Sequence, residues 1–111
     1  MRIGDSDNSM VDSRTTVERN YFFKCSGEIE IVSNKSSENV YRFNTFRNCI
    51  GQLTLRHGRR CRVEGNFFFG GNYTDTGGVR IIDEDHVVVN NYFEGITGLV
   101  RRAPVSMMNG I

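Results

Sequence analysis

Residues 63–70 read Val63-Glu64-Gly65-Asn66-Phe67-Phe68-Phe69-Gly70, and the centre of this stretch recurs along the chain. The pattern Asn-x-Phe occurs four times, and the Asn-to-Asn intervals are 24, 22 and 25 residues. Valine stands three residues before the Asn in three copies, and a glycine follows every copy. The copies are Asn20-Tyr21-Phe22, Asn44-Thr45-Phe46, Asn66-Phe67-Phe68 and Asn91-Tyr92-Phe93. A regular period of this length indicates a repeat architecture.

Each interval between these copies also contains a short run in which apolar and other residues alternate. The runs are residues 28–32, 52–56 and 78–82. Such alternation is typical of half-buried β-strands. A leucine-rich repeat has a similar period but needs many leucines, which are scarce here. We therefore predict an all-β chain that forms a parallel β-helix of about four coils, each of 22–25 residues.

The repeat also predicts which side chains stack from coil to coil. The Phe residues are expected to form an internal aromatic stack, and the Asn residues a hydrogen-bonded ladder at a turn. Two aliphatic columns are expected inside, Ile29-Leu53-Val79 and Ile31-Leu55-Ile81, with Glu30-Thr54-Arg80 as an outward column. Cys25 and Cys49 are expected to stack as buried free thiols, and His86 to be a turn histidine with a structural hydrogen bond.

Composition excludes several classes of protein. The chain has 111 residues and one alanine, so a helical bundle is excluded and at most one domain is expected. The formal net charge of +1 argues against a general nucleic-acid or membrane-surface binder. No apolar run is long enough for a transmembrane helix, and the first residues do not form a visible signal peptide.

Charged residues gather on one face of the predicted solenoid. They are Glu28, Glu30, Lys35, Arg56, His57 and Arg80. One interpretation is a plain solvated surface. The other is a binding site, because two carboxylates on the same side of one strand suit a hard cation such as Ca²⁺. Two carboxylates alone are fewer ligands than Ca²⁺ takes.

Four segments of the chain resemble polysaccharide lyase family 6, which contains alginate lyases and chondroitinase B. The segments are Gly27-Glu28-Ile29-Glu30-Ile31-Val32-Ser33-Asn34-Lys35-Ser36, Leu53-Thr54-Leu55-Arg56-His57-Gly58, Gly77-Gly78-Val79-Arg80-Ile81-Ile82 and Asn90-Asn91-Tyr92-Phe93. The resemblance covers nearly the whole chain and implies a right-handed parallel β-helix. It also implies that residues 1–111 are a single segment of a longer catalytic domain.

The resemblance implies a role for each charged residue in β-elimination on a uronate polymer. Lys35 matches the general base and Arg56 the proposed general acid. Glu28 and Glu30 match Ca²⁺ ligands, with a third ligand expected upstream of this chain, so the piece alone is expected to bind Ca²⁺ incompletely. His57 and Arg80 match residues that bind or neutralise the substrate.

The expected partner is therefore an acidic polysaccharide, alginate before chondroitin or dermatan sulfate, with no nucleic acid or membrane. The resemblance implies secretion or a periplasmic location. Two alternatives stay open at this point. One is a non-catalytic β-helix module that binds acidic glycans or serves as a spacer, and the other is a pectate-lyase-like enzyme, because a shared fold does not fix the substrate.

Overall fold

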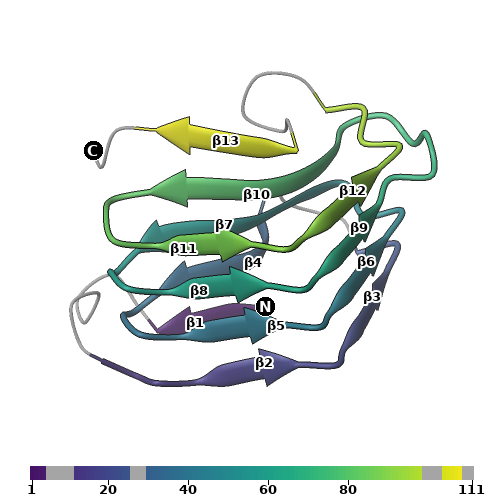
Figure 1. Ribbon diagram of the computed structural model, residues 1–111. Helices are drawn as coiled ribbons and strands as arrows, with labels where there is room; N and C mark the ends of the chain where they lie inside the picture. Colours follow the sequence, from purple (N-terminus) through teal and green to yellow (C-terminus); the bar gives the residue numbers. More distant parts are fainter. Residues whose placement is uncertain (5–11, 26–29, 99–103, 109–111) are drawn as a thin grey trace.

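The structure is a computed structural model that describes residues 1–4, 12–25, 30–98 and 104–108. Over these residues all regular secondary structure is β-strand, arranged in three parallel sheets (Figure 1). Sheet A contains β1 (Arg2–Gly4), β4 (Glu30–Lys35), β7 (Gly51–His57), β10 (Thr76–Ile82) and β13 (Val105–Met108). Sheet B contains β2 (Thr16–Glu18), β5 (Val40–Arg42), β8 (Arg62–Glu64) and β11 (Val87–Val89). Sheet C contains β3 (Tyr21–Phe23), β6 (Thr45–Arg47), β9 (Phe67–Phe69) and β12 (Tyr92–Glu94).

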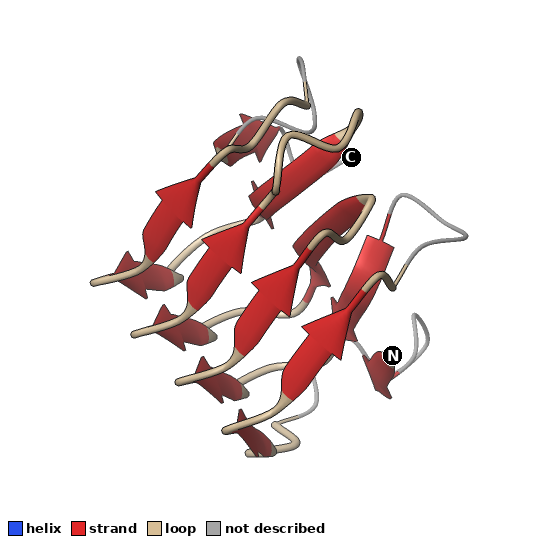
Figure 2. Cartoon of the chain, turned by 90° about the vertical axis from the view of Figure 1, so that its right-hand side faces the viewer, coloured by secondary structure: helices blue, strands red, loops and turns tan. Residues whose placement is uncertain are grey.

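The chain visits the sheets in a fixed order, B then C then A, and each strand pairs with its counterpart one coil away. Figure 2 shows the strands of successive coils lying in parallel rows. This arrangement confirms the predicted parallel β-helix. The solenoid has about three turns, slightly fewer than the four coils expected. Within the described ranges no helix is long and apolar enough to cross a membrane.

The repeated phenylalanines form the predicted stack inside the solenoid. The ring centroids of Phe22, Phe46, Phe68 and Phe93 follow one another at 4.6, 4.8 and 4.9 Å, with nearly parallel planes. Phe46 and Phe68 are buried, whereas the two outer rings are partly exposed. Since each Phe occupies the same position of its coil, this column of rings fixes the register of sheet C.

The repeated asparagines form the predicted ladder at the turn between sheets B and C. Asn44 accepts a hydrogen bond on Oδ1 from the Asn20 backbone N at 3.0 Å, and Asn66 accepts one from the Asn44 backbone N at 2.9 Å. The Nδ2 atoms of Asn44, Asn66 and Asn91 also each donate to a backbone carbonyl of the previous coil, such as Asn66 to Tyr41 O at 3.0 Å. The ladder therefore satisfies backbone groups at a turn that has no strand partners.

The register of sheet A differs from the prediction between the first two coils. Leu53 pairs with Val79 as predicted, but its partner on β4 is Val32 and not Ile29. Ser33, not Glu30, therefore pairs with Thr54 in the outward column. Two register shifts, at residues 30–32 and 34–35, produce this offset. Bulges of this kind insert a residue that alternation alone does not reveal.

The second predicted aliphatic column is also wrong on β4. The partner of Leu55 on β10 is Ile81, as predicted, but its partner on β4 is Asn34 and not Ile31. A polar side chain therefore occupies an inward position that the pattern assigns to an aliphatic one. Asn34 is completely buried.

The predictions for cysteine and for His86 are confirmed, except that Cys25 is only partly buried whereas Cys49 is buried. The three cysteines are free thiols, and Cys25 lies next to Cys49, whose pKa is raised to about 11 chiefly by burial. His86 accepts a hydrogen bond on Nδ1 from the Cys61 backbone N at 3.2 Å, and its Nε2 donates to the Ile82 carbonyl at 2.9 Å. His86 is thus a structural turn residue.

Candidate active site

A cluster of one carboxylate and two guanidinium groups spans three adjacent strands of sheet A. Glu30 on β4 accepts a hydrogen bond from Arg56 Nη1 on β7 at 3.0 Å, and Arg80 Nη1 on β10 lies 3.8 Å from the same carboxylate oxygen. The side chains of Glu30 and Arg80 are 12% and 7% exposed, whereas that of Arg56 is 41% exposed. Arg56 is therefore the member of the cluster that solvent or a ligand can reach most easily. Glu30 and Arg80 are not at the same register position of sheet A, but their side chains are still in contact.

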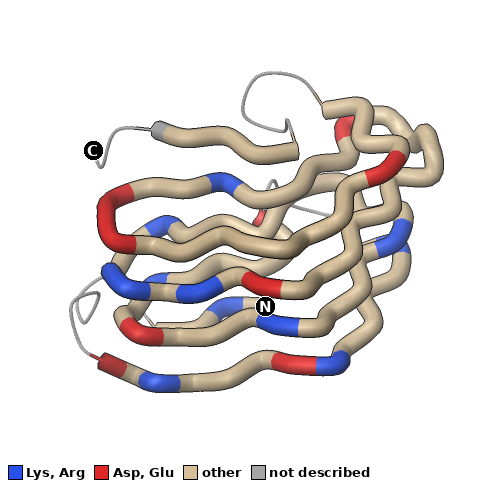
Figure 3. Tube along the Cα trace, viewed as in Figure 1, with Lys and Arg blue, Asp and Glu red and all other residues tan. Residues whose placement is uncertain are grey.

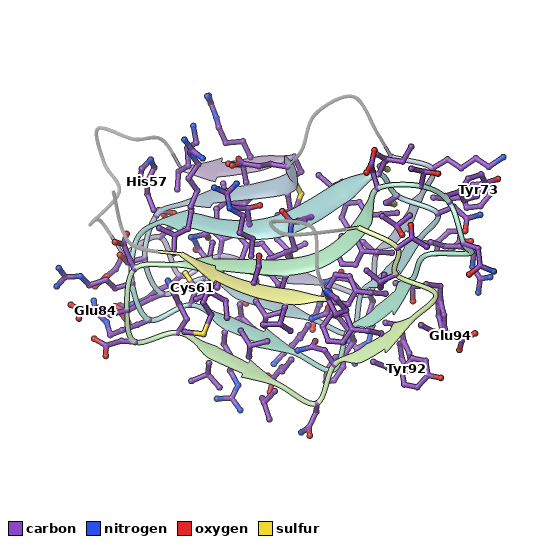
Figure 4. All side chains as sticks on the ribbon, turned by 90° about the horizontal axis from the view of Figure 1, so that it is seen from above. His57, Cys61, Tyr73, Glu84, Tyr92 and Glu94 are labelled. Atoms are coloured by element: carbon purple, nitrogen blue, oxygen red, sulfur yellow. The ribbon has the colours of Figure 1, made fainter. Side chains whose placement is uncertain are left out.

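Lys35 and His57 lie beside this cluster at the ends of β4 and β7. They are register partners, and the register shift between Asn34 and Lys35 leaves Arg56 without a partner of its own in the ladder. Arg56 and His57 are consecutive in the chain, yet both are partly exposed, and His57 points away from the core in Figure 4. Bulges redirect side chains in this way next to functional sites. The bulge thus gathers Lys35, Arg56 and His57 at one end of sheet A.

The turn after His57 requires a glycine. Gly58 has a φ of +94°, and a Cβ there would lie 2.2 Å from the Ser36 carbonyl oxygen. The backbone of the second coil therefore contacts that of the first directly beside Lys35. Only glycine permits both the backbone angle and this approach.

Buried polar groups without partners in the described part of the chain, which the sequence does not single out, adjoin the charged cluster. The Ser33 and Thr54 hydroxyls and both ends of the Gln52 amide are buried and have no hydrogen-bond partner among the described residues. Gln52 pairs with Glu30, and Thr54 with both Ser33 and Arg80, so these groups adjoin the charged cluster. Buried polar groups without partners commonly bind water, an ion or a ligand. No periodic signal marks them, because polar residues are expected on an outward face.

The structure describes only one of the two predicted metal ligands, Glu30. Glu28 lies outside the described residues. Glu30 offers carboxylate oxygen, the donor type that Ca²⁺ prefers, and both of its ion pairs use Oε1. No group of three or more metal-binding side chains occurs among the described residues. The Glu30 carboxylate is thus a suitable type of ligand for a hard cation, but the cation would need further oxygen ligands.

Charged residues elsewhere in the molecule lie mainly at turns (Figure 3). The acidic turn between β10 and β11 faces the basic turn between β7 and β8, where Arg59 lies 3.6 Å from Glu84. Both side chains are largely exposed. These surface pairs contrast with the buried Glu30–Arg80 contact, which makes the sheet A cluster the more unusual feature.

Comparison with known proteins agrees with this geometry. Residues 1–111 match the family profile described as chondroitinase B. The chain belongs to the chondroitinase B family. A search of curated proteins found no match.

Solved structures of polysaccharide lyase family 6 (PL6) have the same fold as this chondroitinase B family chain. The PL6 family alginate lyase AlyGC is 50% identical, with a TM-score of 0.97 over 99% of this chain. A mannuronic acid specific family 6 lyase from human gut microbiota is 42% identical, with a TM-score of 0.87 over 97% of this chain. A PL6 alginate lyase in complex with a trisaccharide is 40% identical, with a TM-score of 0.87 over 89%.

The chain spans only part of these relatives. It covers 15% of the length of AlyGC, 23% of the gut lyase and 20% of the trisaccharide-bound lyase. The resemblance seen in the sequence motifs is confirmed for the family and the fold. The roles of the individual side chains remain predictions.

Proposed function

We propose that this chain contains the catalytic face of a lyase that cleaves alginate by β-elimination. The observation that most supports the proposal is the Glu30–Arg56–Arg80 cluster beside Lys35 and His57, on three neighbouring strands. A base, guanidinium groups and a carboxylate are the groups that uronate elimination needs. The alginate lyases among the solved relatives support alginate as the substrate.

In the proposed reaction, the neutral amine of Lys35 removes the proton at C5 of a uronate ring. The C5–H bond breaks, a C4–C5 double bond forms, and the C4–O4 bond breaks to release the shortened chain. Arg56, the more exposed guanidinium, stabilises the leaving O4 or relays a water proton to it, since guanidinium itself hardly deprotonates. Arg80 and His57 hold the substrate carboxylate.

The proposal includes a Ca²⁺ ion held by Glu28 and Glu30, with further oxygen ligands from upstream of this chain. When bound, such an ion would neutralise the uronate carboxylate and so make the C5 proton more acidic. Chelation with EGTA should then abolish activity, and added Ca²⁺ should restore it. A polymeric substrate that cannot enter the cell also favours a secreted or periplasmic enzyme.

The two lysines of the chain provide a matched test of the proposed base. The ultraviolet absorbance of the unsaturated product is followed with alginate, and separately with chondroitin and dermatan sulfate. Lys35→Ala is expected to lower the alginate rate at least about a hundredfold, as expected for loss of a general base. Lys24→Ala, on the sheet C side, is expected to keep the rate.

The alternative function, a non-catalytic module that binds acidic glycans, makes the opposite prediction. It predicts alginate binding without unsaturated product and no effect of Lys35→Ala on that binding. If a folded sample that includes the upstream Ca²⁺ ligands gives no unsaturated product from any of the three polymers in excess Ca²⁺, the lyase proposal is wrong.

A further inference from the structure

A single buried amide connects the two strand ends that bear Lys35 and His57. Asn34 Nδ2 donates to the Ser36 carbonyl at 2.8 Å and to the His57 carbonyl of the next coil at 2.9 Å. Asn34 Oδ1 accepts from Tyr41 OH at 2.6 Å and from Asn39 Nδ2 at 2.9 Å. The side chain therefore ties the backbone just after Lys35 to the backbone of His57.

The orientation of this amide is fixed by its partners. A primary amide has two donor hydrogens and an oxygen with two lone pairs, and Asn34 uses all of them. Asn34, Asn39 and Tyr41 are each 0% exposed, so water does not compete for these bonds. Burial also raises the pKa of Tyr41, which keeps its hydroxyl protonated and able to donate.

This amide does not belong to the repeat. The ladder asparagines recur in every coil, whereas the register partner of Asn34 on β7 is Leu55, and the next partner on β10 is Ile81. An inward asparagine thus interrupts an aliphatic column at one coil only, beside Lys35. Because this buried polar group occurs in one coil only, a structural requirement shared by all coils does not explain it.

We propose that Asn34, oriented by Tyr41, is a positioning residue that holds Lys35 and His57 in a fixed relation to each other. The inference rests on the proposed lyase function, because it assigns the amide a task in that same site. Asn34 faces the core and does not touch the substrate. It acts through the carbonyls of Ser36 and His57.

Tyr41→Phe tests this inference because it removes one hydroxyl and keeps the ring. In the Ca²⁺-supplemented chain, kcat for alginate is expected to fall about tenfold with little change in KM, since small displacements of reacting groups are costly. Tyr92→Phe is the matched control, because Tyr92 OH also donates one hydrogen bond, to Glu94 at 2.9 Å, but on an exposed surface. Figure 4 shows His57 and Tyr92 on opposite sides of the solenoid. An unchanged kcat in Tyr41→Phe would overturn the inference.

A spectroscopic measurement decides the inference independently of activity. The chain has two lysines, so ¹³C-labelled lysine gives two side-chain signals, with Lys24 as the internal reference. Tyr41→Phe is expected to shift the Lys35 signal and leave the Lys24 signal in place, and Tyr92→Phe to shift neither. A Lys35 signal that does not move would contradict the inference. An inactive wild-type sample that includes the upstream Ca²⁺ ligands would refute the lyase proposal alone, since the Lys35 signal still reports on positioning.

A second pair of variants applies if Tyr41→Phe does not fold. Asn34→Ser and Asn44→Ser each shorten a completely buried asparagine, one in the proposed positioning network and one in the ladder, where Asn44 Nδ2 donates to the Val17 carbonyl. Only Asn34→Ser is expected to move the Lys35 signal. If the Lys35 signal shifted equally in both variants, Asn34 would have a structural role and not a specific positioning role.

Discussion

His86 shows how one side chain can join two coils only in its neutral form. Its Nδ1 accepts a hydrogen bond from the Cys61 backbone N, so this nitrogen must be unprotonated. Burial lowers the pKa of His86 below its ordinary value of 6.5, although the Ile82 carbonyl and the nearby Asp83 and Asp85 oppose this shift. Because the folded state prefers neutral His86, the residue links stability to pH.

The sign of the effect follows from the lowered pKa. Above pH 6.5 both states are mainly neutral at this residue, and the stabilisation is fully present. As the pH falls below 6.5, the unfolded chain binds a proton first and stability is lost. Urea unfolding should therefore be easier at about pH 5.5 than at about pH 7.5, on either side of the ordinary histidine pKa.

The chain has one other histidine, so the control is simple. His86→Phe should lose most of this pH dependence, whereas His57→Phe should retain it. The carboxylates Asp12 and Glu18, whose pKa values are also lowered, contribute mainly at lower pH because their ordinary values are 3.8 and 4.5. If the His86→Phe variant loses as much stability as the wild type when the pH is lowered, His86 does not cause the pH dependence.

At the scale of the element, the phenylalanine column predicts different costs for the same substitution in different coils. Phe68 is 1% exposed and stacks on Phe46 and Phe93, whereas Phe93 is partly exposed and its one stacked partner among the described residues is Phe68. Phe68→Leu is expected to lower the free energy of unfolding by about 2 kcal/mol, and Phe93→Leu by about half as much. Chemical denaturation monitored by circular dichroism measures both, and equal losses would contradict the prediction.

The repeat elements could be predicted from the sequence because their markers recur at near-constant intervals. The Asn ladder, the Phe column and the pairing of Leu53 with Val79 follow from counting residues between identical types. The same logic failed on β4. The bulges in β4 shift its register against β7, and no feature of the alternating sequence marks where a bulge occurs. A strand that is shifted by an odd number of residues still shows the same alternation in sequence, so the pattern does not reveal which residues face inward.

The candidate site could be predicted in part for a similar reason. Charged outward residues stand out in a pattern of apolar and polar positions, so the sequence marks Lys35, Arg56 and Arg80 as candidates. Asn34 belongs to a segment that resembles the lyase family, but the sequence does not predict that its side chain is buried. Polar residues in an alternating strand are usually expected to face solvent. Its hydrogen bonds to Tyr41 and to the His57 carbonyl depend on tertiary structure, and a single sequence does not encode them in any local signal.

For the molecule as a whole, stability comes from the interior rather than from surface charge. The stacked rings and hydrogen-bonded amides continue through successive coils, whereas the ion pairs lie mainly at turns and edges. Apart from Arg80, every arginine in the described ion pairs has a side chain at least 40% exposed. Exposed pairs of this kind contribute about 0–1 kcal/mol each and are weakened by salt.

Salt should therefore separate the stability of the fold from the binding of an acidic polymer. Raising NaCl from about 0.01 M to about 1 M shortens the screening length from about 30 Å to about 3 Å. The free energy of unfolding is expected to change by less than about 1 kcal/mol, because the ladder and the stacks do not depend on long-range charge. Over the same range the KM for alginate should rise, because the proposed function has Arg56, Arg80 and Lys35 attract the polymer carboxylates, and salt screens that attraction. A loss of several kcal/mol in stability with an unchanged KM would mean that surface charge stabilises the fold and contributes little to binding.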